Sequence, residues 1–181
     1  MEHIIEALKV VKEILCRHSG IYNLECSLVN DLEECFPDKC STFCIYALLK
    51  LLYETILQKA YYILQDISEE DFYKIIRKRT KAYASFKATM ITRLKGVNGV
   101  FKKKILKTYL KVSQYTHPSI TIHKAYPRLD YELILTILDH IIYFEILINR
   151  ERVASKANRL RDLICSLGLM KSCKKLSSIN E

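Results

Sequence analysis

The chain has 181 residues, of which half are hydrophobic, and its formal net charge is +9. This length and apolar content suit one folded domain with a substantial core and exclude a largely disordered chain. The sequence contains no recognisable secretory signal, and its most apolar stretch, residues 131–148, carries Glu132, Asp139 and Glu145, which argues against a membrane span. We therefore expect a cytoplasmic protein.

Helices are predicted from the start of the chain, because only four glycines and three prolines are present to interrupt them. Apolar residues recur at helical spacing over residues 3–17 and 23–35, and the second of these segments ends before Pro37. A third helix is expected from Ser41, a good N-cap, to about residue 66. Apolar side chains cover most of its circumference, which predicts a central, buried helix.

The second half of the chain continues the helical pattern. A fourth helix is predicted from Ser68, which is followed by an acidic first turn, to about Leu94. After a glycine-containing turn, a fifth helix is expected over residues 100–116. Beyond a loop with two prolines, a long last helix begins near Asp130 and extends to about Ser166.

No segment shows the alternation of a β-strand, and no internal repeat is present. The predicted fold class is therefore all-α, a helical bundle with a long C-terminal helix, packed around the third, fourth and last helices. We expect residues 1–166 to form a single helical-bundle domain and residues 167–181 to form a flexible basic tail.

A basic block covers residues 74–128, which contain fifteen lysines and arginines and no acidic residue. The rest of the chain holds fourteen basic and twenty acidic residues, a net charge of −6 that cannot neutralise the block. A positive field must therefore remain somewhere on the surface, and such a field attracts polyanions, nucleic acids in particular. The basic block thus indicates a class of partner and not a reaction.

Seven cysteines are many for an intracellular chain. None forms a C-x2-C pair, and the spacing of Cys35, Cys40 and Cys44 is a weak indication of a metal site. We interpret the cysteines mainly as small buried hydrophobic residues, with disulfides or a metal site as the alternatives. Intracellular disulfides are more common in hyperthermophiles, and the abundance of Ile, Lys and Tyr fits such a source.

Inside the basic block, residues 109–119 read YLKVSQYTHPS. This run resembles the HEPN superfamily, in particular archaeal helical members in which a helix ends in a Y-x-x-x-S-x-Y-x-H-P-S-like run. The resemblance implies a compact helical bundle, a dimer and, as in many members, metal-independent RNA cleavage by an R-x(4–6)-H motif. It is specific over these eleven residues, and the rest of the chain shares only the helical architecture.

The resemblance implies roles for three residues. His117 corresponds to the motif histidine, which takes part in transfer from the ribose 2′-hydroxyl, although a histidine at a helix end also commonly caps the last carbonyl groups. Lys111 stands where the motif has arginine, so it keeps the charge and loses the bidentate fork. Ser113 lies one helical turn before His117 and is placed to orient the imidazole. This chemistry requires no metal and no cofactor.

Other residues of the basic block are candidates for contacts with RNA. Tyr115 can stack on an unpaired base, although its helical spacing also fits a core aromatic residue. The lysines can bind phosphates, or they can be solvated or paired with acidic residues of the last helix. The full set of candidates is Arg77, Lys78, Arg79, Lys81, Lys103, Lys104, Lys107, Tyr115 and His123.

These observations lead to three hypotheses. The first is a HEPN-like RNA-binding protein, a homodimer with weak metal-independent ribonuclease activity through His117 and Lys111. The second is a non-catalytic helical adaptor or DNA-binding module that contacts phosphates through the basic block. The third is a subunit that binds an acidic protein partner and no nucleic acid. The salt dependence of nucleic-acid binding discriminates among them.

Overall fold

The computed structural model describes residues 2–16, 24–36, 39–78, 86–116 and 128–177, without the side chains at positions 76–78, 151, 152 and 154–159. The described residues form helices and no strand, so the all-α prediction is confirmed. In chain order the helices are α1 (Glu2–Leu15), α2 (Leu24–Cys35), α3 (Thr42–Ile63), α4 (Glu69–Lys78), α5 (Ala88–Thr92), α6 (Gly99–Tyr115), α8 (Tyr131–Ile148), α9 (Arg150–Ser166) and α10 (Met170–Ser177).

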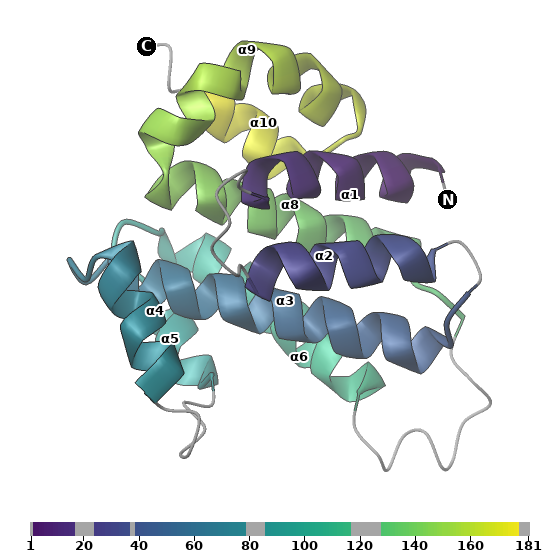
Figure 1. Ribbon diagram of the computed structural model, residues 1–181, viewed down its shortest axis with the longest axis horizontal. Coiled ribbons are helices and arrows are strands. Elements are labelled where there is room, and N and C mark those ends of the chain that lie inside the picture. Colours follow the sequence, from purple (N-terminus) through teal and green to yellow (C-terminus); the bar gives the residue numbers. More distant parts are fainter. Residues whose placement is uncertain (1, 17–23, 37–38, 79–85, 117–127, 178–181) are drawn as a thin grey trace.

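The centre of the bundle is the pair α3 and α8, which pack directly against each other. Helix α1 covers α8, α2 covers α3, and Figure 1 shows α1, α2 and α3 side by side with nearly parallel axes. The core is apolar on both central helices, with Tyr53 and Ile56 of α3 and Ile137 and Ile141 of α8 fully buried. The prediction of a central, buried third helix is confirmed.

Several helix starts follow from local capping, as the sequence predicts. The Ser41 hydroxyl accepts a hydrogen bond from the Cys44 N–H at 3.2 Å at the start of α3. The Asp130 carboxylate accepts one from the Leu133 N–H at 3.0 Å at the start of α8. Such side-chain acceptors satisfy backbone N–H groups that have no partner within the helix.

The fourth and last predicted helices are each divided, and those two predictions are wrong in this respect. The first division separates α4 from α5, two short helices at one end of the bundle, so the fourth helix is not central as expected. The second lies at Asn149, whose backbone (φ −128°, ψ 43°) leaves the helical region between α8 and α9. Helix α1, and not the fourth, completes the core around α8.

The expected flexible tail is instead ordered over residues 167–177. Helix α10 packs against α8 and α9, and it buries Ser172 and Leu176 together with the preceding Leu169. The expectation of a flexible tail is therefore wrong for these residues, while residues 178–181 lie outside the described part. No described helix is both long and apolar enough to cross a bilayer.

All seven cysteines lie in the described part, and six of them are paired in disulfides: Cys16–Cys26, Cys35–Cys40 and Cys165–Cys173. Cys44 is the remaining free thiol. The interpretation of the cysteines as unpaired buried residues is therefore wrong for these six. Disulfides are typical of oxidising compartments and of intracellular proteins from hyperthermophiles, and other intracellular disulfides are mostly catalytic or redox-sensing. The cytoplasmic location stays a prediction.

Candidate functional site

The described part of the basic block presents one continuous cationic stripe, on α6. Lys103, Lys107 and Lys111 are spaced four residues apart and therefore lie on one side of the helix; we call these three residues the α6 lysine face. The opposite side of α6 is fixed in the core by buried residues such as Phe101 and Ile105. The face borders a shallow depression of about 500 Å³, lined by Lys103, Leu106, Lys107, Leu110, Lys111 and Gln114.

The three lysines of this face differ in their surroundings. Lys103 and Lys107 are exposed, and no carboxylate of the described residues forms an ion pair with either. Lys111 instead donates a hydrogen bond to Asp130 Oδ2 at 2.6 Å, and this bond raises the pKa of Lys111 above its ordinary value. Asp130 is also the N-cap of α8, so this ion pair joins the end of α6 to the start of α8. A phosphate at Lys111 would have to compete with that carboxylate.

The structure does not bring the predicted catalytic residues together within its described part. His117 and His123 lie outside the described residues, as do Arg79 and Lys81. The Ser113 hydroxyl oxygen is shielded from solvent, and the Tyr109 hydroxyl is among its polar neighbours. Its predicted role beside His117 stays a prediction.

Tyr115 is packed against the bundle. Its ring stacks on Tyr46 of α3, with centroids 4.4 Å apart and an angle of 9° between the ring planes. The Tyr46 hydroxyl accepts a hydrogen bond from the Asp130 N–H at 2.7 Å, and burial raises the pKa of Tyr46 to about 12. One face of the Tyr115 ring is therefore covered by protein, which favours the core interpretation of this residue over base stacking.

Elsewhere in the basic block, charges are partly matched. Lys74 lies 2.8 Å from Glu70 Oε1 and 3.3 Å from Asp71 Oδ1 on the surface of α4. Lys104 is exposed on the stripe of α6 next to the α6 lysine face. Arg77 and Lys78 belong to α4, but the structure does not describe their side chains.

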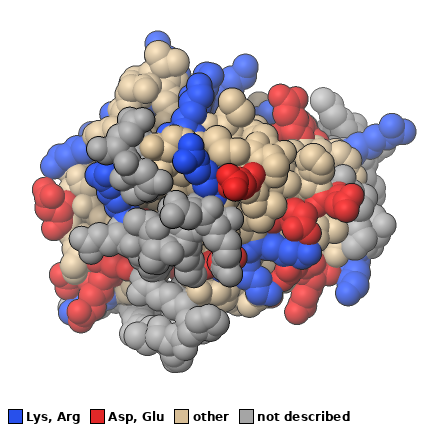
Figure 2. Space-filling view, turned by 90° about the horizontal axis from the view of Figure 1, so that it is seen from above, with Lys and Arg blue, Asp and Glu red and all other residues tan. Residues whose placement is uncertain are grey.

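Figure 2 shows the side of the molecule that is uppermost in Figure 1, where basic and acidic side chains are interspersed. On this face neither sign of charge forms a patch of its own.

Sequence reasoning missed a buried ionic cluster around Lys59, which we call the Lys59 cluster. The Lys59 ammonium lies 2.9 Å from Glu145 Oε1, 3.0 Å from Glu69 Oε1 and 3.9 Å from Glu25 Oε1. The side chains of Lys59, Glu25 and Glu145 are almost completely buried. Tyr73 donates a hydrogen bond to Glu25 Oε1 at 2.8 Å. The one signal in the sequence was a lysine on the largely apolar third helix.

The Lys59 cluster has a structural role and not a catalytic one. Burial alone lowers the pKa of Lys59, but the carboxylates of Glu145, Glu25 and Glu69 outweigh it and raise the pKa above its ordinary value. An ammonium that keeps its proton cannot act as a nucleophile or form a Schiff base. The cluster therefore holds helices together and is a poor candidate for an active site.

A second buried polar contact joins the two central helices. The Tyr53 hydroxyl of α3 lies 2.7 Å from Nδ1 of His140 on α8. Burial, together with the charges of Lys171 and Lys104, lowers the pKa of His140 to about 3. The imidazole is thus neutral at physiological pH and closed off from solvent, which does not suit proton transfer to an external substrate.

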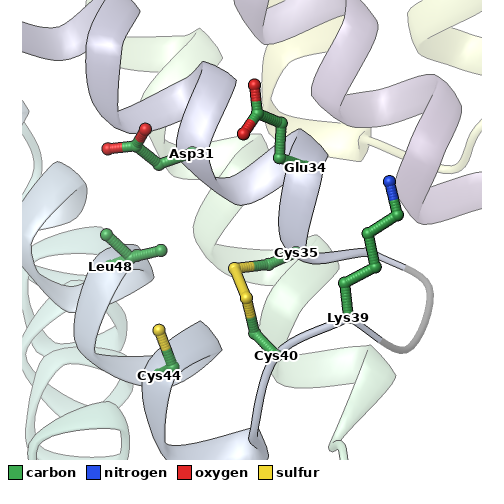
Figure 3. Close-up of a pocket in the computed structure, with 7 residues that line it drawn as sticks. All are labelled: Asp31, Glu34, Cys35, Lys39, Cys40, Cys44 and Leu48. Carbon is green, nitrogen blue, oxygen red and sulfur yellow. A yellow bond between two sulfur atoms is a disulfide. The ribbon is translucent and has the colours of Figure 1, made fainter.

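Three cysteines at the junction of α2 and α3 bring their sulfur atoms close together. The Sγ atoms of Cys35, Cys40 and Cys44 all lie within 4.8 Å of one another, and Figure 3 shows Cys44 beside the Cys35–Cys40 bond. In the sequence, the spacing of these three cysteines was a weak indication of a metal site. Two of the three sulfurs are joined in a disulfide and so cannot serve as thiolate ligands in this form.

Comparison of the chain with protein families, with curated proteins and with solved structures finds no match. The HEPN resemblance therefore depends on residues 109–119 and on the helical architecture, and it stays a prediction.

Proposed function

We propose that the protein binds single-stranded RNA, with the α6 lysine face as its phosphate-binding surface. The observation that carries the proposal is the absence of any ion pair at Lys103 and Lys107 among the described residues, on a helix with no acidic residue. Lysine ammonium groups bind phosphates as point charges, and each contact releases counterions from the nucleic acid. Four-residue spacing places successive lysines about 6 Å apart along the helix axis.

The apolar residues beside the lysines support a single-stranded ligand. Leu110 is 51% exposed, and Leu106 is half-buried beside it in the same depression. Exposed apolar surface next to unmatched lysines suits an RNA whose bases are unstacked, because such bases can turn their faces toward the protein. A duplex presents mainly its phosphates and makes no use of these leucines.

Cleavage of the RNA is a separate matter from binding. The HEPN resemblance implies catalysis by His117 with Lys111, but Lys111 already has Asp130 as its partner at 2.6 Å. We therefore propose binding as the main function and treat cleavage as one outcome of the same experiment. The homodimer that the resemblance implies stays a prediction, which light scattering coupled to size-exclusion chromatography tests.

The test uses fluorescence anisotropy with an end-labelled single-stranded RNA over a series of salt concentrations. The variant Lys103→Gln with Lys107→Gln is compared with Lys9→Gln with Lys174→Gln, which removes the same charge from exposed positions on α1 and α10. We expect the first variant to bind about tenfold more weakly and to lower the slope of log affinity against log salt by about 1.4, which corresponds to two lost contacts. The second variant should keep wild-type affinity.

The remaining outcomes separate the alternatives. Equal affinities for both variants would refute the α6 lysine face as the binding surface. A preference for duplex DNA over single-stranded RNA would favour the DNA-binding module, and no binding at physiological salt would favour the subunit for an acidic protein partner. RNA fragments that form in the presence of EDTA, and that do not form with His117→Ala, would show that the protein also cleaves RNA without a metal ion.

A further inference from the structure

The junction of α2 and α3 contains a disulfide with a free thiol next to it. Cys35 is the last residue of α2, Cys40 precedes the N-cap Ser41, and Cys44 lies in the first turn of α3. The three Sγ atoms are within 4.8 Å of one another, although two of them form the disulfide. The other two disulfides have no such neighbour, because Cys44 is the only free cysteine and all seven cysteines are described.

The three cysteines also line the same surface depression. All three cysteines line one surface depression of about 640 Å³, together with Asp31, Glu34, Lys39 and Leu48 (Figure 3). Cys40 and Cys44 are half-buried, whereas Cys35 is 5% exposed. A small thiol or disulfide reagent can therefore reach at least two of the sulfurs without unfolding of the bundle.

We propose that this cluster is a thiol–disulfide exchange site in which Cys44 is the attacking thiol. The Cys44 thiolate attacks one sulfur of the Cys35–Cys40 bond, a new disulfide forms to Cys44, and the other cysteine leaves as a thiolate. One S–S bond breaks and one forms, so no oxidant or reductant is consumed. The proton released by Cys44 is replaced by the proton that the leaving thiolate takes up from solvent.

The consequence is one disulfide shared among three cysteines. A bond between Cys35 and Cys44 would join the end of α2 directly to the first turn of α3, whereas a bond between Cys40 and Cys44 would leave Cys35 free. An external thiol compound enters the same cycle by attacking the disulfide, and Cys44 then displaces it from the mixed disulfide. The ligand class of the site is therefore thiols and disulfides, independent of any nucleic-acid binding.

The first test maps thiols in the folded wild-type protein. The protein is incubated at pH 8 with a low concentration of iodoacetamide, which reacts slowly, then quenched in acid and digested without reduction for mass spectrometry. We expect the label on Cys35 or Cys40 as well as on Cys44, each with the complementary disulfide. Label on Cys44 alone at every time point would overturn the proposal.

The second test uses variants that force the alternative bonds. In Cys35→Ser we expect a Cys40–Cys44 disulfide to form in a glutathione redox buffer, and in Cys40→Ser a Cys35–Cys44 disulfide. Cys173→Ser is the matched control, because it leaves Cys165 without a third cysteine nearby and should give no new intramolecular bond. If neither variant forms its new bond, although circular dichroism shows a folded bundle, the proposal is refuted. If the variants do not fold, the wild-type labelling decides alone.

Discussion

The Lys59 ammonium of α3 lies 2.9 Å from Oε1 of Glu145 on α8, and both side chains are removed from water. Glu69 of α4 and Glu25 of α2 approach the same ammonium from two other helices. The Lys59 cluster therefore links the three consecutive helices α2, α3 and α4 to the distant helix α8 at one buried point. Because charges at such a point cannot be solvated by water, loss of the lysine leaves carboxylates without a counterion.

We predict that Lys59→Met lowers the free energy of unfolding by about 3 to 5 kcal/mol, the usual cost of leaving a buried charge without its partner. Urea denaturation followed by circular dichroism measures the change. The control is Lys9→Met on α1, where the ion pair to Glu6 at 2.7 Å is exposed and its loss should change stability little. Similar stabilities for the two variants would contradict the prediction.

The buried His140 makes the free energy of unfolding depend on pH in a predictable direction. Its pKa is lowered to about 3 by burial and by the charges of Lys171 and Lys104, whereas an unfolded histidine titrates near 6.5. Between these values the unfolded chain binds a proton that the folded chain does not. The free energy of unfolding should therefore fall by about 1.4 kcal/mol per pH unit below about 6.5, with no contribution from this residue above it.

The measurement is urea denaturation at several pH values between 7.5 and 4.5. In His140→Asn the free energy of unfolding should fall less steeply with decreasing pH than in the wild type. The difference in slope corresponds to one proton, because carboxylates contribute equally to both proteins. His3→Asn changes an exposed histidine on α1 and should leave the wild-type slope in place. An unchanged slope in His140→Asn would show that this imidazole does not stay neutral in the fold.

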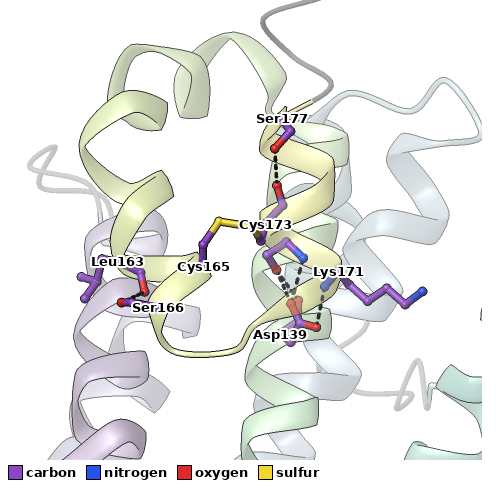
Figure 4. Close-up of a disulfide and its surroundings, with 8 residues drawn as sticks. Asp139, Leu163, Cys165, Ser166, Lys171, Cys173 and Ser177 are labelled. Carbon is purple, nitrogen blue, oxygen red and sulfur yellow. Dashed lines mark hydrogen bonds between the residues drawn. A yellow bond between two sulfur atoms is a disulfide. The ribbon is translucent and has the colours of Figure 1, made fainter.

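Asp139 fixes the start of α10 on the surface of α8. Its carboxylate accepts hydrogen bonds from the backbone N–H groups of Lys171 and Ser172 at 3.0 and 2.9 Å, and from the Ser172 hydroxyl at 2.7 Å (Figure 4). We predict that Asp139→Ala lowers the free energy of unfolding by about 1 to 3 kcal/mol, the cost of losing a cap with buried partners. Hydrogen exchange at residues 170–177 should become faster in the same variant.

Ser177→Ala is the matched control for Asp139→Ala. Ser177 donates a hydrogen bond to the Cys173 carbonyl at 3.1 Å at the other end of α10, where no N–H group depends on it (Figure 4). Exchange in α10 should stay close to wild type in this variant. If Asp139→Ala behaves like Ser177→Ala, then the Cys165–Cys173 disulfide and the apolar contacts hold α10 without help from the carboxylate.

The sequence predicts those parts of the fold that depend on neighbouring residues. Ser41 and Asp130 start helices through hydrogen bonds three residues away, and such local signals are visible in a single chain. The division at Asn149 is different, because it is coupled to tertiary structure. The Asn149 side chain donates to Glu145 Oε2 at 2.8 Å, and Glu145 itself belongs to the Lys59 cluster. The sequence does change from apolar to charged after Ile148, but apolar residues at helical spacing resume at Val153, so the pattern alone predicts one continuous helix.

Less of the candidate site than of the fold could be predicted from the sequence. The spacing of the α6 lysine face follows from helical geometry, but the ion pair between Lys111 and Asp130 joins residues on two helices and could not be read from the spacing. In the sequence, Glu145 and Asp139 are acidic residues of the predicted last helix, which was one possible source of partners for the lysines of the basic block. In the fold one binds Lys59 and the other caps α10, because their partners arrive from different parts of the chain.

Tyr115 provides a test that separates packing from RNA recognition. Because its ring stacks on Tyr46 at 4.4 Å, we predict that Tyr115→Leu lowers the free energy of unfolding by about 1 to 3 kcal/mol. The same change should leave RNA affinity within about twofold of wild type, since a base adds about 1 to 3 kcal/mol only where it stacks on an available ring.

The two readouts for Tyr115→Leu are thermal unfolding and RNA anisotropy, measured on one protein preparation. Lys107→Gln is the reciprocal control, because Lys107 is exposed and should affect binding without changing stability. A Tyr115→Leu protein that melts like the wild type but binds RNA tenfold more weakly would contradict the prediction. The ring would then have to leave Tyr46 when RNA binds, and the phosphate-binding surface would extend from the α6 lysine face to the end of the helix.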